Sequence, residues 1–163
     1  MKKTSGGLVL YKEDRQNHQV FVLVAHPGGP YFKNKDKGWW SIPKGEPEPE
    51  EDIFLAALRE FEEETGMIPS GPYLDLGSIV QNNGKVVFAW AFAGDWPDSR
   101  LPVCNKISME YPKGSGQMWE FPEIDRVAFL PIDQAKEKLR PQQVPLLERL
   151  MDQVALAKTS RAT

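Results

Sequence analysis

Apolar residues along the chain follow two periods, one typical of strands and one typical of helices. Short runs rich in Val, Leu and Phe between polar turns are typical of strands. Apolar residues at i, i+3, i+4 and i+7 are typical of a helix with one buried face. The sequence therefore predicts strands at residues 8–11, 20–25, 73–80, 85–93 and 126–130, and helices at residues 50–65, 132–139 and 143–158.

Strands and helices are mixed without a regular βαβ alternation, so we expect an α+β fold, or an αβα sandwich around a mixed sheet. The polar turn at residues 12–19 and the Asn-Gly turn at 81–84 predict two hairpins. In the first long helix, Gly66 is a natural residue to end the helix. Its apolar face consists of Phe54, Ala57, Leu58 and Phe61.

Two segments lack either period and are predicted as loops. Residues 27–40 are rich in Gly, Pro and Lys, and residues 94–122 are rich in Pro, Gly and polar side chains. A connection as long as the second is usually functional or disordered. Within it, residues 105–117 are interpreted either as a flap that contacts substrate or as a mobile surface loop.

Composition and charge narrow the class of protein. The 163 residues suit one domain, predicted at 1–163, and 40% hydrophobic with 26% charged residues is ordinary for a soluble protein. The net charge of −3 gives no general attraction to nucleic acid or anionic membrane, so neither is expected as a partner.

The cysteine content and the longest apolar runs indicate where the protein would be found. Cys104 is the single cysteine, which excludes an intrachain disulfide, disfavours a cysteine zinc site and fits a reducing cytoplasm. The N-terminal segment has too short an apolar run for a signal peptide, and no run approaches the roughly 20 residues that cross a membrane. We expect a cytoplasmic protein.

Four glutamates crowd the end of the first long helix. Carboxylates at a helix C-terminus cost a few tenths to about 1 kcal/mol each, and the i,i+4 pair Glu60 and Glu64 adds a similar repulsion. Glu60, Glu63 and Glu64 project to one side and offer hard oxygen ligands to Mg²⁺ or Mn²⁺, and a bound cation would relieve those penalties. The alternative is a solvated acidic helix end, the commoner meaning of a glutamate run.

The spacing around the glutamates is far from random. From Gly45 the chain reads Gly, five residues, Glu51, seven residues, Arg-Glu-Phe, one residue, Glu-Glu, one residue, Gly-Met. Seven fixed positions at frequencies of about 0.06 match by chance roughly once in 10⁹ starting points. Residues 45–67 resemble the Nudix box, GX5EX7REUXEEXGU with U bulky and apolar, at every fixed position.

This resemblance implies a Nudix-type αβα sandwich that hydrolyses a nucleoside diphosphate linked to another group. It further implies that Glu60, Glu63 and Glu64 bind metal and that Arg59 orients them. Gly45 would allow a sharp turn into the helix, where Glu51 would brace the loop. The general base varies within the family, and Glu60 is our choice; the predicted catalytic residues are Glu60, Glu63 and Arg59.

Outside the box, the family often adds a metal-binding glutamate from a later loop. Glu123 is our first candidate and Glu120 the second, with Glu110 behind them. Lys44 is interpreted as a charge beside the phosphates, or else as an exposed loop lysine.

Aromatic and basic side chains supply the remaining candidates for substrate binding. Trp39, Trp40 and Trp119 are candidates for stacking on a base, with core packing or hydrophobic shielding as the alternative. Lys113, in the predicted flap, is a further candidate for contact with substrate. His18 and His26 are predicted as surface or loop residues without a role.

The substrate is predicted only by class. The segment Trp-Ser-Ile-Pro-Lys-Gly-Glu resembles the diadenosine-polyphosphate and diphosphoinositol branches, and Phe-Pro-Glu-Ile-Asp-Arg is similar to bacterial predicted NTP pyrophosphohydrolases. We expect a Mg²⁺-dependent pyrophosphohydrolase, monomeric or homodimeric, with dinucleoside polyphosphates or NTPs as first substrates. The alternatives are nucleotide sugars or ADP-ribose as substrate, a non-catalytic nucleotide sensor, and a plain acidic domain.

Overall fold

A mixed β-sheet forms the centre of the computed structural model, which describes residues 3–162, with the side chains of 159–162 left out. The sheet contains β1 (Thr4–Glu13), β2 (Val20–Pro27), β3 (Lys44–Gly45), β4 (Tyr73–Val80), β5 (Val86–Ala93) and β8 (Ile124–Pro131). Its strand order is β4-β5-β1-β2-β8, with β3 paired to β1. Only β1 and β5 run parallel among the described pairs, so the sheet is mixed, as predicted.

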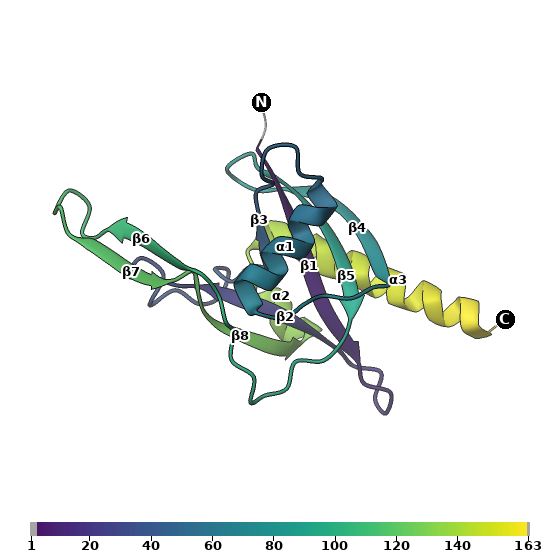
Figure 1. Ribbon diagram of the computed structural model, residues 1–163. Coiled ribbons are helices and arrows are strands. Elements are labelled where there is room, and N and C mark those ends of the chain that lie inside the picture. The colour runs from purple at the N-terminus through teal and green to yellow at the C-terminus, as the bar shows by residue number, and fades with distance from the viewer. Residues whose placement is uncertain (1–2, 163) are drawn as a thin grey trace.

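Helices cover both faces of this sheet (Figure 1). Helix α1 (Ile53–Thr65) lies on one face, and α2 (Ile132–Lys138) and α3 (Val144–Ala162) lie on the other. Successive side chains of β1 point to opposite faces of the sheet. Leu8 and Leu10 therefore pack in the core under α1, and Val9 packs in the core on the α3 side. The αβα sandwich expected from the sequence is confirmed.

The elements predicted from periodicity are present with shifted ends. Both predicted hairpins form, β1 with β2 and β4 with β5. Helix α1 begins three residues later than predicted, because the Asp52 side chain caps it by accepting from the Phe54 N–H. It ends at Gly66, whose φ of 82° is left-handed, as predicted.

The predicted loop at 94–122 is wrong in part. It contains β6 (Lys106–Glu110) and β7 (Met118–Pro122), which pair as a separate antiparallel hairpin. This β6–β7 hairpin projects from the body, on the side away from the end of α3 (Figure 1). Its strands are short and carry several charged residues, and glycines with positive φ, Gly114 and Gly116, form its turn. These features hid the strand pattern.

The sequence analysis also missed strand β3, whose two residues lie in the candidate site. Strand β2 pairs with β1 only at Tyr11–Glu13, and β3 pairs with β1 nearer its start, at Gly6 and Gly7. Ser41 bridges to Ala25 of β2. The segment before α1 therefore lies between β1 and β2 where these strands separate. It brings Lys44 and Gly45 next to α1, on the side where Glu60 lies.

In the part of the chain that the structure describes, no helix combines the length and apolar character that a bilayer crossing requires.

Candidate functional site

The last turns of α1 carry the predicted glutamates onto strand β3. A methyl group added at Gly45 would overlap the carboxyl group of Glu60, so the missing side chain at Gly45 makes room for that carboxylate. This differs from the role predicted for Gly45, which was a sharp turn into the helix. Gly45 instead lies in β3 and pairs with Gly6 of β1.

Arg59 binds three carboxylates. Its Nε and Nη2 donate to the two oxygens of Glu51 at 2.9 and 2.8 Å, and its Nη1 donates to Glu60 and Glu63 at 2.9 and 3.1 Å. Bidentate contacts of this kind fix orientation as well as charge. Hydrogen bonds from Arg59 and from the Glu48 N–H lower the pKa of Glu51 to about 2, and those to Glu51 raise the pKa of Arg59.

Glu51 and Arg59 together brace the segment ahead of α1. Glu51 accepts from the Glu48 N–H at 3.0 Å, and Arg59 Nη2 donates to the carbonyl of Glu46 at 3.1 Å. The segment between β3 and the helix is thus tied to the same guanidinium that holds the helix glutamates. This geometry matches the bracing and orienting contacts that the resemblance implied for these two residues.

Glu64 is the most buried acid of the group, with 5% of its surface exposed. Its Oε2 accepts from the backbone N–H of Lys44 at 2.8 Å. Burial raises the pKa of Glu64 well above its ordinary value, and repulsion from Glu123 and Glu60 acts in the same direction. Such a group favours either protonation or a nearby cation.

Glu60 and Glu123 share this environment. Burial raises the pKa of Glu60, against the opposing hydrogen bond from Arg59, and Glu63 and Glu123 add repulsion. Burial also raises the pKa of Glu123, where Glu63 adds repulsion and Lys44 opposes it. Glu123 is therefore within electrostatic range of the helix glutamates, although it is about 60 positions later in the chain.

Glu123 is held at the turn between β7 and β8. Its carbonyl accepts from the Gly28 N–H and its own N–H donates to Asn105, both at 2.9 Å. Glu120, the second candidate from the sequence, lies instead on the exposed strand β7, with its Oε1 3.7 Å from Lys106 Nζ. Glu110 accepts from the N–H groups of Gly114 and Gly116 in the hairpin turn. Of the three candidates, Glu123 is the one whose charge acts on Glu60 and Glu64.

Lys44 introduces a positive charge under the same carboxylates. Burial lowers the pKa of Lys44, and repulsion from Lys85 adds to that effect while attraction to Glu64 opposes it. Lys44 is thus partly buried rather than an exposed loop lysine. Its charge lies close enough to Glu64 and Glu123 to be felt by both.

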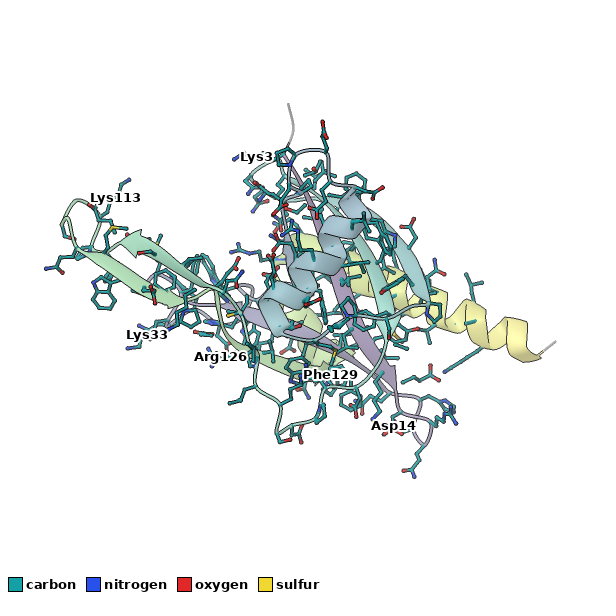
Figure 2. All side chains as sticks on the ribbon, in the orientation of Figure 1. Lys3, Asp14, Lys33, Lys113, Arg126 and Phe129 are labelled. Atoms are coloured by element: carbon teal, nitrogen blue, oxygen red, sulfur yellow. The ribbon has the colours of Figure 1, made fainter. Side chains whose placement is uncertain are left out.

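The predicted substrate contacts lie in different surroundings, and among them the structure contradicts the prediction for Trp40. Trp40 is 5% exposed and packs in the core, with its Nε1 donating to Asp36 at 2.8 Å, so no ring face is open to a base. Lys113 lies at the far tip of the β6–β7 hairpin, away from α1 (Figure 2). Trp39 is partly exposed, but Lys35 Nζ and the Arg140 guanidinium lie 5.2 and 5.4 Å from its ring centre.

His26 is wrongly predicted as a surface residue, because it is fully buried. Its Nδ1 is 2.8 Å from Asp125 Oδ1, and its Nε2 donates to the Lys35 carbonyl at 2.7 Å. These bonds join β2, the loop at 27–40 and the start of β8, two residues after Glu123. Only the flanking apolar strand residues could have signalled this burial, and one histidine at the end of an apolar run is a weak signal.

The donor set suits a divalent cation, but the carboxylates are turned toward protein donors. Among residues 3–162, no group of three or more His, Cys, Asp or Glu side chains could hold a metal ion as placed. Glu60, Glu63 and Glu64 each direct one oxygen to Arg59 or to the Lys44 N–H. The second oxygen of each makes no hydrogen bond to the described residues, and carboxylate oxygens are the hard ligands that Mg²⁺ prefers.

A cavity of about 690 Å³ lies elsewhere, at the β1–β2 turn. Its lining includes Asp14 and Phe129, which Figure 2 shows at the bottom of the molecule. None of the predicted site residues lines it. The glutamates, and not this cavity, therefore mark the candidate active site.

Comparisons with known proteins identify the family and the fold. The family described as NUDIX domain matches residues 1–150 of the chain. No curated protein matches it.

Solved structures with low sequence identity share the fold. The C. elegans Ap4A hydrolase, solved as a binary complex, has a TM-score of 0.62 at 18% identity, over 94% of this chain and 98% of that one. The NUDIX domain of Shewanella oneidensis NrtR complexed with ADP ribose has a TM-score of 0.63 at 15% identity, over 94% and 89%. A Nudix hydrolase from M. smegmatis, RenU, has a TM-score of 0.59 at 17% identity, over 95% and 87%.

Proposed function

The chain belongs to the NUDIX family, and from that premise we propose that it hydrolyses a diphosphate linkage in a nucleotide with the help of a divalent cation. Dinucleoside polyphosphates and NTPs are the first candidates as substrate. One observation carries the proposal: Glu60, Glu63 and Glu64 are within electrostatic range of Glu123, at a site that also contains Lys44 and Arg59.

We assign Glu60, Glu63, Glu64 and Glu123 as the residues that would hold Mg²⁺ or Mn²⁺. When bound, the cation neutralises phosphate charge and lowers the pKa of a water molecule. Magnesium usually takes one or two protein carboxylates and fills its remaining positions with water and phosphate oxygens. Four carboxylates are therefore enough for more than one ion.

The remaining chemistry belongs to the protein. Arg59 fixes Glu60 and Glu63 and is itself fixed by both oxygens of Glu51. Glu60 lies against Gly45 with one oxygen free of hydrogen bonds, and we assign it as the base that accepts the proton of the attacking water. Lys44 supplies a compact positive charge for the phosphates.

A substrate panel tests this function directly. The purified protein would be incubated with dinucleoside polyphosphates, NTPs, dNTPs, ADP-ribose and nucleotide sugars, with Mg²⁺ or with EDTA, and the products separated by chromatography. We expect cleavage of at least one compound with Mg²⁺ and none with EDTA. ADP-ribose is included because the NrtR domain complexed with it has the same fold.

Glu63→Gln should lower kcat at least 100-fold, because it removes a carboxylate but keeps an oxygen that can accept from Arg59. Glu62→Gln is the matched control, since Glu62 is on the same helix turn but exposed. Equal activity of the two variants would contradict the proposal. Tight nucleotide binding without cleavage of any compound would instead identify a non-catalytic sensor.

A further inference from the structure

The β6–β7 hairpin has one polar and one aromatic face. Side chains alternate between the two faces along a strand, so Trp119 and Phe121 of β7 lie on the same face. Their cross-strand partners on β6, Met109 and Ile107, lie on that face too. Tyr111 extends this face past the end of β6, and Tyr31 of the loop at 27–40 contacts it. We call Tyr31, Tyr111, Trp119 and Phe121 the aromatic face of the hairpin.

The rings on this face are ordered but not covered. The Tyr31 and Tyr111 rings are 5.2 Å apart and the Tyr111 and Trp119 rings 5.4 Å apart, both edge to face. Even so, 45% of Tyr31 and 48% of Trp119 remains exposed. A two-stranded hairpin is marginally stable on its own in water, so aromatic rings that stay exposed on it add little to its stability. Exposed apolar side chains gathered on one face are typical of a binding surface.

The aromatic face leads directly to the glutamates. Trp119, Phe121 and Glu123 are two residues apart, and the Phe121 ring lies where a side chain at Gly29 would project. The Gly28 N–H donates to the Glu123 carbonyl, which fixes this end of the hairpin against the body. Four residues of strand at 3.3 Å each place Trp119 about 13 Å from Glu123.

Charge around the hairpin suits an anionic ligand. Lys33 lies beside the base of the hairpin and Lys113 at its tip (Figure 2). Both are exposed, and neither forms an ion pair with any residue from 3 to 162. The acidic Glu120, by contrast, lies on the opposite face, paired with Lys106.

We propose that the aromatic face binds the base of the nucleotide substrate, whose phosphate chain runs along β7 to the glutamates; this inference rests on the proposed function. A nucleobase presents a flat π surface that stacks on aromatic rings irrespective of its identity. The phosphates attached to it need cations, and Lys33 lies beside the hairpin while the proposed metal site lies at the end of the path. The occupant is therefore a nucleotide rather than an apolar peptide.

Binding without turnover tests the face. In a Glu63→Gln background with Mg²⁺, the dissociation constants of ATP and of inorganic tripolyphosphate would be measured by isothermal titration calorimetry. Trp119→Ala should weaken ATP binding about 5- to 150-fold, because stacking contributes that much per base, and leave tripolyphosphate binding unchanged. Trp119→Tyr should retain most of the ATP affinity.

Met118→Ala is the matched control, because Met118 is the preceding residue of β7, is 64% exposed and faces the other way. It should change ATP binding less than twofold. Tyr31→Ala, on a different segment, should weaken ATP binding like Trp119→Ala, which separates loss of stacking from collapse of the hairpin. Circular dichroism would confirm that each variant is folded.

Three results would overturn the inference. The first is an equal effect of Trp119→Ala and Met118→Ala on ATP affinity, and the second is an equal loss of affinity for tripolyphosphate and ATP in Trp119→Ala. The third is normal ATP binding of Trp119→Ala together with a changed oligomeric state in sedimentation equilibrium. The last would assign the face to a second copy of the chain. If the substrate panel is silent but ATP binding depends on Trp119, the proposed hydrolysis fails while the base-binding face stands. If the panel shows cleavage but Trp119→Ala alters neither KM nor ATP binding, only the face fails.

Discussion

The end of helix α1 and the β6–β7 hairpin each place side chains in surroundings that do not suit them, and they do so in opposite directions. At α1 the carboxyl group of Glu64 is withdrawn from water, with 5% of the residue exposed. On the hairpin the Trp119 ring is left in water, with 48% exposed. Buried charge and exposed apolar area both oppose stability, so each marks a region shaped by something other than folding.

The two regions differ in how they are held. Fixed donors, the Arg59 guanidinium and the Lys44 N–H, bind the α1 carboxylates. The hairpin is tied to the body mainly near its base, where the Glu123 carbonyl accepts from Gly28 and Cys104 contacts the backbone of Ile124. We expect rigid chemistry at the helix and adaptable recognition at the hairpin, which suits an enzyme that must place phosphates accurately and tolerate different bases.

The largest effect should come from Gly45→Ala. The added methyl overlaps the Glu60 carboxyl, which ends a flexible side chain and can swing aside while the fold persists. Displacing a catalytic group by about 1 Å can cost roughly 100-fold in rate. We therefore expect at least a 100-fold loss of kcat with little change in melting temperature, measured by steady-state kinetics and thermal unfolding.

Gly6→Ala is the contrasting variant. Its added methyl meets the carbonyl oxygen of Ile53 and the backbone N of Ala57, and backbone cannot rotate away. That variant should lose stability, because helix α1 has to move off the sheet. If Gly45→Ala unfolded as readily as Gly6→Ala, Gly45 would serve packing and not the placement of Glu60.

The second effect concerns the stability of the metal-free protein at different pH. Burial raises the pKa of Glu64 above its unfolded value, so below about pH 4.5 the group is protonated in both states and contributes no difference. Between that pH and the raised pKa only the unfolded chain releases its proton, so stability falls as pH rises, and the loss is complete above the raised pKa. Glu64→Gln cannot ionise and keeps an oxygen for the Lys44 N–H.

In EDTA at pH 8, Glu64→Gln should therefore unfold with a free energy about 1–3 kcal/mol higher than the natural chain. At pH 4 the two proteins should differ little. Urea unfolding at both pH values measures this, with exposed Glu62→Gln as control. A Glu64→Gln protein less stable at pH 8 would mean that Lys44 and its neighbours already compensate the charge of Glu64.

The sequence predicted the helix site better than the hairpin, for a physical reason. Glu51, Arg59, Glu60 and Glu63 lie within one helix and the turn before it, where spacing along the chain determines proximity in space. Glu123 was the first candidate for the later glutamate that the resemblance implies, and it is within electrostatic range of the helix glutamates, whereas Glu120 lies on the exposed strand β7. Contacts between distant segments leave no periodic mark, which is why His26 was missed.

The fold shows the same limit. Strands and helices with strong alternation were predicted to within a few residues. The two-residue strand β3 exists because β1 and β2 separate, and no pattern within Lys44 and Gly45 could announce it. Trp40 was misjudged because a Trp-Trp pair gives no sign of which ring enters the core.

The smallest effect should come from Glu120→Gln, and it sharpens the contrast between the two regions. Glu120 has the same chemistry as Glu123 and is three residues away, but its side chain is 67% exposed and its oxygen lies 3.7 Å from Lys106 Nζ. An exposed pair of this kind contributes about 0–1 kcal/mol. We expect Glu120→Gln to change the free energy of unfolding by less than about 1 kcal/mol and kcat by less than twofold, whereas Glu123→Gln lowers kcat at least tenfold. A tenfold loss in Glu120→Gln would bring the polar face of the hairpin into the reaction, and recognition and chemistry could then no longer be assigned to separate regions.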